Sequence, residues 1–520
     1  MSKARGIIAF VFVLGIFAIL GYYWLLPTFF EREQLSTSDA GNISMTWRIG
    51  GDNYLGYFFL TSNEMKKQLL SRGMQVVFTD DGGDYATRLK KFADGEYDAI
   101  VLPVNSYLYH GKDHKYPGVI ATSICESRDA DAIIGFADRF PTGNIKELNN
   151  ANLRIVYVKD SPSEFLIDLT IADFGLDQLK SSSAWRVPVG SQEEVLAKLE
   201  KHQGDAFVLW EPNVSKALQT QGVKYLWGSD KFRGYIVDGL VFHRDVIDKY
   251  LEQENSPLLA FLRTYFQTID TYANDEDRLV EEMVSTTGLK ENAVRTMMKK
   301  IEWFDLRENA TLQFGIPIPG VQIANDGVIT TINSCLQVML RTKRLTENPL
   351  PNKNPYLIMN SLPLKKLTEA GVVATVAANT SGTVDFQPLD AAGWKRLREA
   401  ATLRLENITF DRGTNFLDEE GKTRVDELAV LLANNYPNFR VLVRGHTSSG
   451  GDDGENMKLS QLRADVVVQR LIAVHRLNEN RLRADGVGSS MPAPMRPNES
   501  VREYRYRLAR VEFVLYEPNI

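Results

Sequence analysis

The sequence predicts an α/β protein with one N-terminal transmembrane helix, a large first soluble unit and a smaller α+β unit at the C-terminus. Three observations lead to this prediction. An apolar run opens the chain, strand-like and helix-like segments alternate over residues 44–367, and a strand, a polar loop and an amphipathic helix follow one another over residues 440–474. Because 520 residues with 44% hydrophobic content exceed what one core usually supports, two soluble domains are expected.

Residues 6–30 are predicted to form a transmembrane anchor. The uncharged core at 7–26 is 20 residues long, and as a helix it would span roughly 30 Å, the thickness of a bilayer's hydrocarbon core. Lys3 and Arg5 precede the run, which favours a cytoplasmic N-terminus. A cleaved signal peptide is the alternative, but its apolar region would be shorter and no small-x-small cleavage motif follows. Residues 31–43 are expected to be a polar tether.

Strand and helix patterns alternate along the first soluble unit. Strands are predicted at residues 44–50, 74–79, 98–102, 132–136, 154–158 and 206–209, and helices at 57–71, 85–93, 163–174 and 193–201. This alternation is typical of a parallel sheet with helices on both faces. In such sheets ligands bind at the carboxyl ends of the strands, where loops and helix N-termini supply hydrogen-bond donors.

Polar loops follow several of these strands and supply the candidate ligand-binding residues. In chain order they are Asp52, Asn53, Tyr54, Asn105, Ser161, Ser163, Trp210 and Glu211. Some have a structural alternative. Ser161, Pro162 and Glu164 fit a helix capping box with Pro at the first helical position. Trp210 could equally fill apolar space between two lobes.

Three short motifs carry a resemblance in this unit: Gly56-Tyr57-Phe58-Phe59, residues 95–100 and Asp160-Ser161-Pro162-Ser163. In their order along residues 44–370 they resemble the periplasmic-binding-protein fold of ABC-transporter substrate-binding proteins, particularly the nitrate, sulfonate and thiamine-precursor group. The resemblance implies a two-lobed domain that closes on a small polar or anionic solute. No catalytic triad or cysteine cluster is visible in the sequence, so a binding protein without cofactor or metal is expected, not an enzyme. A disulfide between Cys125 and Cys335 is permitted but not required.

The C-terminal unit contains Gly445-His446-Thr447-Ser448-Ser449-Gly450, followed by Asn456, Leu459-Ser460 and Arg463-Ala464. Arg463 borders the apolar stripe of its helix, where its planar guanidinium is placed to meet a carboxylate. With Arg510 near the end, the segment resembles the OmpA-like peptidoglycan-binding family over residues 403–520. In that family an Asp in the loop and an Arg on the helix hold the diaminopimelate of the stem peptide.

The resemblance implies a set of peptidoglycan-binding residues: His446, Thr447, Ser448, Asn456, Arg463 and Arg510. The Arg is kept as Arg463, but Ser448 occupies the Asp position. A hydroxyl supplies no opposite charge, so weaker binding is expected, because charge-assisted hydrogen bonds are about twice as strong as neutral ones. Asp452 and Asp453 could replace the missing carboxylate, or could form a solvated acidic loop.

Residues 371–402 are predicted to link the two soluble units, with a helix over 390–402. The whole sequence therefore predicts a single-pass inner-membrane protein with its bulk in the periplasm. It would bind a small solute and peptidoglycan. A membrane protein of the envelope is a possible further partner. The alternatives are a ligand-free scaffold of an envelope complex and a solute donor for an ABC transporter. Nucleic acid is not an expected partner at a net charge of −6.

Overall fold

The computed structural model describes residues 43–318, 326–371, 384–411, 413–448, 450–495 and 499–517. The predicted anchor at 6–30 lies outside these residues, as does the tether up to residue 42. Among the helices of the described part, each falls short of the length and apolar character that a membrane span needs.

The first lobe is built on a six-stranded sheet in the order β11-β4-β10-β3-β1-β2. Its strands are β1 (Met45–Gly51), β2 (Met74–Asp80), β3 (Ala99–Pro103), β4 (Gly118–Ser127), β10 (Val237–His243) and β11 (Ile301–Trp303). β1 runs parallel to β2 and β3, whereas β10 runs antiparallel to β3 and β4. Every residue of β3 and β4 is buried, as expected for strands covered on both faces.

The second lobe is built on a five-stranded sheet in the order β7-β6-β8-β5-β9. Its strands are β5 (Asp131–Phe136), β6 (Ile155–Val158), β7 (Arg186–Val189), β8 (Ala206–Trp210) and β9 (Val223–Gly228). β6 is parallel to β7 and β8, and β5 is antiparallel to β8 and β9. The prediction of purely parallel sheets is therefore wrong. The chain crosses between the lobes twice, from β4 to β5 and from β9 to β10. The strands that follow the two crossings, β5 and β10, are antiparallel to their neighbours.

Helices between the strands cover both sheets. They include α2 (Phe58–Thr61), α3 (Asn63–Leu70), α4 (Tyr85–Ala93), α5 (Val104–Gly111), α6 (Pro162–Phe174), α7 (Asp177–Ser181), α8 (Gln192–Glu200) and α9 (Asn213–Ala217). The single helix predicted over 57–71 is divided at Ser62, whose extended backbone and side chain cap α3 by accepting from Met65 N. The helix α6 was predicted within one residue, because Ser161 and Pro162 begin it and Gly175, with a φ of 64°, ends it.

Further helices follow the second crossing. They are α10 (Arg244–Tyr250), α11 (Pro257–Ala273), α12 (Glu276–Thr287), α13 (Glu291–Met298), α14 (Leu306–Glu308), α15 (Gly327–Arg341) and α16 (Leu362–Glu369). The helix α15 contacts α5 of the first lobe and α6 of the second, and so lies across both. Cys125 and Cys335 are free, buried thiols.

The C-terminal unit is a four-stranded sheet in the order β12-β15-β13-β14 with α18 and α19 packed together over it. Its elements are α17 (Ala391–Arg396), β12 (Arg398–Leu403), α18 (Glu419–Asn434), β13 (Arg440–Gly445), α19 (Asp453–Ala473), β14 (Leu482–Gly486), α20 (Val501–Leu508) and β15 (Val511–Glu517). The predicted helix over 390–402 is wrong beyond residue 396, because β12 pairs with β15 along the edge of the sheet. Long-range pairing here overrides the local preference of an Ala- and Arg-rich segment.

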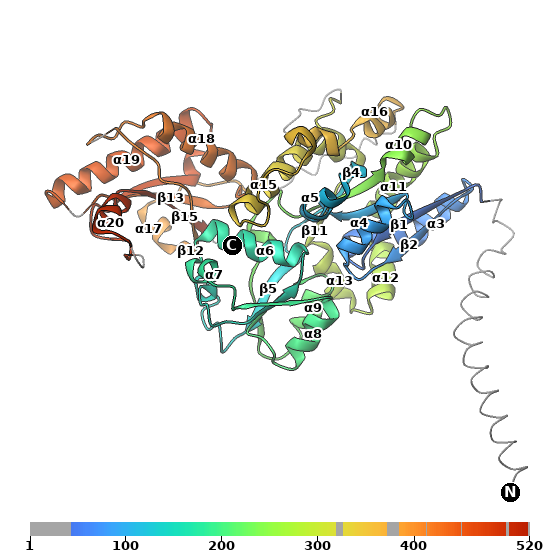
Figure 1. Ribbon diagram of the computed structural model, residues 1–520, viewed down its shortest axis with the longest axis horizontal. Helices are drawn as coiled ribbons and strands as arrows, with labels where there is room; N and C mark the ends of the chain where they lie inside the picture. The colour runs from blue at the N-terminus through green and yellow to red at the C-terminus, as the bar shows by residue number, and fades with distance from the viewer. Residues whose placement is uncertain are drawn as a thin grey trace, which may run out of the picture.

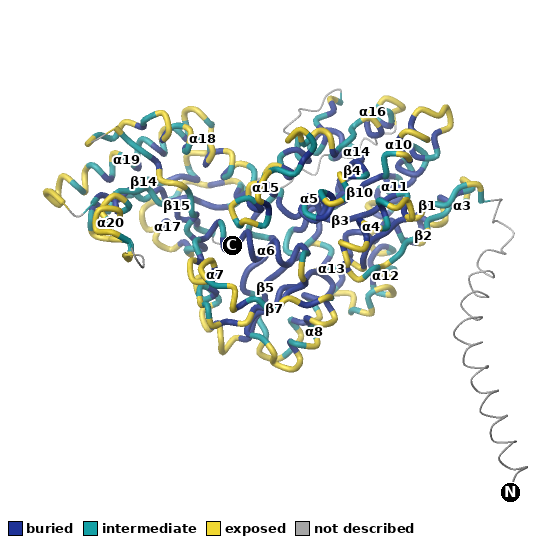
Figure 2. The backbone as a smooth tube through the Cα atoms, viewed as in Figure 1, coloured by how far each residue is buried: buried dark blue, intermediate teal, exposed yellow. Residues whose placement is uncertain are grey.

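The C-terminal unit lies beside the second lobe, next to α6, α7 and α15 (Figure 1). The strands of all three sheets are mostly buried, whereas exposed stretches concentrate on outer helices such as α8, α10 and α19 (Figure 2). The α6 helix therefore runs from the loop predicted to bind ligand to the surface that meets the C-terminal unit.

Candidate functional site

In the first lobe, the predicted ligand residues lie at the ends of β1 and β3. The Asp52 carboxylate accepts from Tyr54 N at 3.0 Å and pairs with the fully buried Arg88 at 2.9 Å. Asn53 is exposed, and Tyr54 is buried. Asn105 lies in the first turn of α5 and is only 2% exposed, yet its Oδ1 has no hydrogen-bond partner among the described residues. Asn105 thus carries a buried acceptor available to a ligand.

In the second lobe, the side chains of the predicted serines form hydrogen bonds at the start of α6. The Ser161 hydroxyl accepts from Ser163 N at 3.1 Å and donates to Val158 O at 2.6 Å. Ser163 is fully buried, with its hydroxyl 3.4 Å from Val208 O. The predicted capping box is wrong in its second half: Glu164 accepts from Asp160 N at 2.7 Å, one residue before the cap.

Trp210 ends β8, at the edge that faces the first lobe, and Glu211 follows it. The Cη2 atom of Trp210 lies 3.4 Å from the position that a Cβ would take at Gly83, so the indole reaches across to the loop after β2. Its Nε1 is buried without a hydrogen-bond partner in the described part of the chain. Glu211 is fully buried and accepts from Lys300 Nζ at 2.8 Å. Trp210 therefore bridges the lobes, and Glu211 is held by an ion pair.

Two buried carboxyls missed by the sequence reasoning lie at the same place. Asp131 begins β5 directly opposite Trp210, and Asp238 is the second residue of β10, opposite Pro103. Burial, with Glu211, Asp52 and Asp129 nearby, raises the pKa of Asp131 to about 7. Burial also raises the pKa of Asp238 well above its ordinary value, although Tyr57 donates to it at 2.5 Å. An acidic residue at the start of an otherwise apolar strand was the signal available in the sequence.

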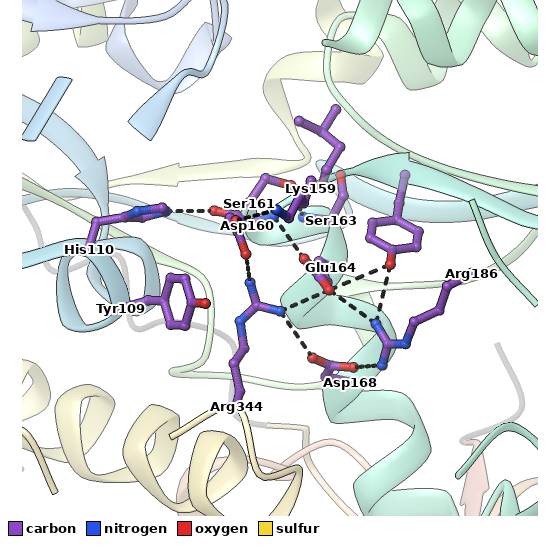
Figure 3. Close-up of polar contacts among 12 residues, drawn as sticks. Tyr109, His110, Lys159, Asp160, Ser161, Ser163, Glu164, Asp168, Arg186 and Arg344 are labelled. Atoms are coloured by element: carbon purple, nitrogen blue, oxygen red, sulfur yellow. Dashed lines mark hydrogen bonds and ion pairs between the residues drawn. The ribbon is translucent and has the colours of Figure 1, made fainter. Parts of the chain in front are cut away.

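A second polar cluster joins α15 to the start of α6 (Figure 3). Arg344, 12% exposed, pairs with Asp160 at 2.5 Å and with Glu164 at 2.9 Å, and lies 3.7 Å from Asp168. From the first lobe, His110 Nε2 lies 3.0 Å from Asp160 O. Burial lowers the pKa of His110, which favours its neutral form. These contacts hold α15, α5 and the start of α6 together.

In the C-terminal unit, a pocket of about 700 Å³ opens beside the predicted loop. Its lining residues are Ser448, Gly450, Arg502, Glu503, Arg505 and Tyr506. Arg463 is half-buried on α19, where Nε donates to Thr414 O at 3.0 Å and Cζ lies 4.9 Å from the centroid of the Phe410 ring. Burial lowers the pKa of Arg463. Thr414 and Phe410 thus fix the direction of this guanidinium.

The other predicted residues of this unit support the loop. His446 and Thr447 are buried, and His446 Nε2 lies 3.1 Å from the Glu512 carboxylate. Arg510 Nε donates to the same carboxylate at 2.8 Å. Despite burial, His446 and Arg510 lower the pKa of Glu512 to about 2. Glu512 therefore stays ionised and links the end of β13 to the start of β15 beside the loop.

Asn456 and the two loop aspartates lie at the start of α19. Asn456 Nδ2 donates to Gly450 O at 3.0 Å. Asp452 is the N-cap of α19 and accepts from Glu455 N at 2.9 Å, while Asp453 accepts from Ser489 at 3.3 Å. Asp452 therefore has a structural role as the cap of α19. The sequence alone had left open whether it replaces the missing carboxylate of the loop.

Comparison with known proteins places the C-terminal unit in a family. Residues 409–505 match the model of the OmpA family. The Probable lipoprotein YiaD of Escherichia coli is 35% identical over 109 residues, which are 21% of this chain and 48% of the relative. Outer membrane porin F of Pseudomonas aeruginosa is 32% identical over 104 residues, 20% of this chain and 29% of the relative. The chain spans less than half the length of both relatives, and the predicted resemblance to the OmpA family is confirmed.

The solved structures that match cover the first unit. One is the alkanesulfonate-binding protein SsuA from Xanthomonas axonopodis pv. citri, with 13% identity and a TM-score of 0.44 over 59% of this chain and 95% of that chain. Another is the periplasmic nitrate-binding protein NrtA from Synechocystis PCC 6803, with 9% identity and a TM-score of 0.45 over 64% of this chain and 92% of that chain.

Proposed function

We propose that this protein holds a small solute between two lobes and attaches to peptidoglycan through its C-terminal unit. The observation that carries the proposal is the combination in one chain of a two-lobed α/β unit and an OmpA-family unit. The facing strand ends of the lobes bear buried polar groups, including the unpartnered Oδ1 of Asn105. Buried polar atoms without partners are rare in folded proteins, and a ligand satisfies them.

The cellular arrangement in this proposal follows the sequence. Residues 6–30 anchor the chain in the inner membrane with the N-terminus in the cytoplasm, and residues 31–43 form the tether. Residues 44–370 form the binding unit in the periplasm, residues 371–402 the linker and residues 403–520 the peptidoglycan-binding unit. Lipoprotein and porin relatives of the C-terminal unit support an envelope location.

Peptidoglycan attachment is tested through Arg463 and Ser448 in the full chain. Arg463→Ala removes the charged partner that we propose for a stem-peptide carboxylate, so sedimentation with purified sacculi should be lost. Ser448→Asp restores a countercharge for an ammonium group and should strengthen sedimentation, since a hydrogen bond to a charged group contributes about 1.5–3 kcal/mol. Arg476→Ala, on the loop after α19, is the matched control and should sediment as wild type does. Wild-type protein that stays in the supernatant, together with an inactive Ser448→Asp variant, would refute attachment.

A ligand-free scaffold remains the second candidate, and the Arg344 cluster favours it. Ion pairs that join α15 to α6 while His110 contacts Asp160 oppose the opening of the two lobes. A solute-binding protein must open to exchange ligand. If no solute in a metabolite library raises the melting temperature of the full chain, the scaffold is the better description.

A further inference from the structure

Where the two lobes meet, carboxyl groups outnumber the cations that pair with them. Six carboxyl groups gather there, from Asp52, Asp81, Asp129, Asp131, Glu211 and Asp238. Arg88 is divided between Asp52 at 2.9 Å and Asp81 at 2.5 Å. Lys300 is divided between Glu211 at 2.8 Å and Asp129 at 3.5 Å.

Asp131 and Asp238 are the two carboxyls whose strongest charged neighbours are other carboxyls. The charged groups acting most on Asp131 are Glu211, Asp52 and Asp129, and those acting most on Asp238 are Asp131 and Asp52. Asp131 is 2% exposed and Asp238 is 1% exposed. A buried carboxylate without a cation is costly, and a positively charged partner relieves that cost.

Trp210 adds an independent observation at the same place. Opposite residues of an antiparallel pair have side chains on the same face of the sheet, so Trp210 and Asp131 lie on one face of the second-lobe sheet. The indole is 3% exposed, reaches the Gly83 loop, and its Nε1 has no hydrogen-bond partner among described atoms. An indole face next to carboxylates is the combination that recognises organic cations.

Aromatic side chains from the first lobe complete the surroundings. Tyr57 donates to Asp238 at 2.5 Å, and Tyr85 donates to Asp52 at 3.3 Å. Asn105, two residues beyond the strand position paired with Asp238, contributes its unpartnered acceptor. Aromatic walls with a few acceptors suit a desolvated organic cation better than an anion, which would meet repulsion from the ionised carboxylates here.

We propose that the two lobes hold between them a small organic cation bearing a protonated amine or a quaternary ammonium group, with Asp131 and Asp238 as its countercharges and Trp210 against its face. This inference rests on the proposed function, because it names the solute class for the same site between the lobes. It replaces the polar or anionic solute expected from the sequence motifs. Asp131 and Asp238 lie on β5 and β10, outside those motifs.

The test uses the full chain in detergent with choline, putrescine and agmatine as cationic probes and nitrate and methanesulfonate as anionic ones. Scanning fluorimetry and calorimetric titration should show that at least one cation raises the melting temperature and binds, while the anions do not. Asp131→Asn and Asp238→Asn should each weaken that binding at least tenfold. Asp138→Asn, at an exposed site just after β5, should leave it unchanged.

Trp210→Phe keeps an aromatic ring in the same place and should weaken binding several-fold, which provides a second readout if an aspartate variant fails to fold. Binding of nitrate or methanesulfonate in place of the cations would overturn this inference and leave solute binding intact. Cation binding that survives both aspartate substitutions would also overturn it. A chain that binds none of the five probes would count against both the inference and the proposed function.

Discussion

Asp131 shows how one residue makes stability depend on pH. Burial raises its pKa from 3.8 to about 7 in the folded protein. The unfolded chain releases this proton near its ordinary pKa, whereas the folded chain keeps it to about pH 7. The folded state therefore binds more protons between these values, and its stability falls as pH rises through that window. Above the window the loss is complete and the contribution becomes constant.

Asp131→Asn should remove this dependence in the ligand-free protein, because an amide has no proton to release. Relative to wild type, the variant should gain stability from about pH 4 to pH 7, by at most about 4 kcal/mol at 1.36 kcal/mol per pH unit. Urea unfolding at several pH values measures the difference, and Asp138→Asn should follow the wild-type curve. A wild-type protein that becomes more stable relative to Asp131→Asn as pH rises would contradict the assignment.

At the scale of elements, α6 was predictable and the crossing strands were not. Ser161-Pro162 and Gly175 are local signals that begin and end α6, and the apolar run of β3 is equally local. The strands β4 and β10 are defined by pairing between segments more than a hundred residues apart. Their mixed directions, and with them the meeting of Asp131 with Asp238, follow from the two crossings, which no local pattern encodes.

The candidate sites show the same contrast between local sequence signals and long-range contacts. Loop residues beside predicted strands, such as Trp210 and Asn105, do lie at the facing edges of the lobes. Arg344 follows a helix that the sequence analysis did not single out, and its partners lie more than 170 residues earlier. In the C-terminal unit, family spacing identified Ser448 at the pocket, but the lining from α20 depends on the tertiary arrangement.

Arg344 is expected to stabilise the joint between α15 and α6. Its removal leaves Asp160 and Glu164 with one fewer cation in a site where the guanidinium is 12% exposed, so Arg344→Ala should lower the free energy of unfolding by about 3 kcal/mol. Arg295→Ala is the matched control, since its three acidic partners are each more than 60% exposed. Such surface pairs contribute below about 1 kcal/mol. Equal losses for the two variants, measured by chemical denaturation, would argue against a buried joint.

At the scale of the whole molecule, membrane attachment is expected to depend on residues 7–26. Placing two charges in the middle of the run, as in Ile16→Lys with Ile19→Lys, should prevent insertion, because each Lys near the bilayer centre costs about 2.5–3.5 kcal/mol. The wild-type chain should remain in the membrane pellet after alkaline carbonate washing, and the double variant should not. Ile16→Leu with Ile19→Leu serves as the conservative control. Retention of the doubly charged variant in the pellet would place the anchor elsewhere.

The binding unit and the C-terminal unit share a polar and aromatic interface. Asp173, near the end of α6 and 1% exposed, accepts from Tyr436 Oη and from Arg341, each at 2.5 Å, and its carbonyl accepts from Arg404 N at 2.7 Å. Arg233, in the crossing from β9 to β10, exchanges two 2.8 Å hydrogen bonds with Asn435. The C-terminal unit is thus attached both to α6 and to a segment that joins the lobes, so movement of the lobes would be transmitted to it.

This interface should make the two units unfold together. Calorimetry of the full chain should give one cooperative transition, and Tyr436→Phe with Asn435→Ala should separate it into two. Leaving the buried Asp173 without its Tyr436 donor costs about 1–3 kcal/mol. Removing the Asn435 amide also removes its hydrogen bond to Arg233 O, so both substitutions weaken the interface between the two units. Tyr506→Phe with Asn255→Ala is a control pair: Tyr506 is 75% exposed, and Asn255 is exposed between α10 and α11 of the first lobe. Two separate transitions already present in the wild-type chain would show that the interface does not couple the units, and that lobe closure is not transmitted to the C-terminal unit.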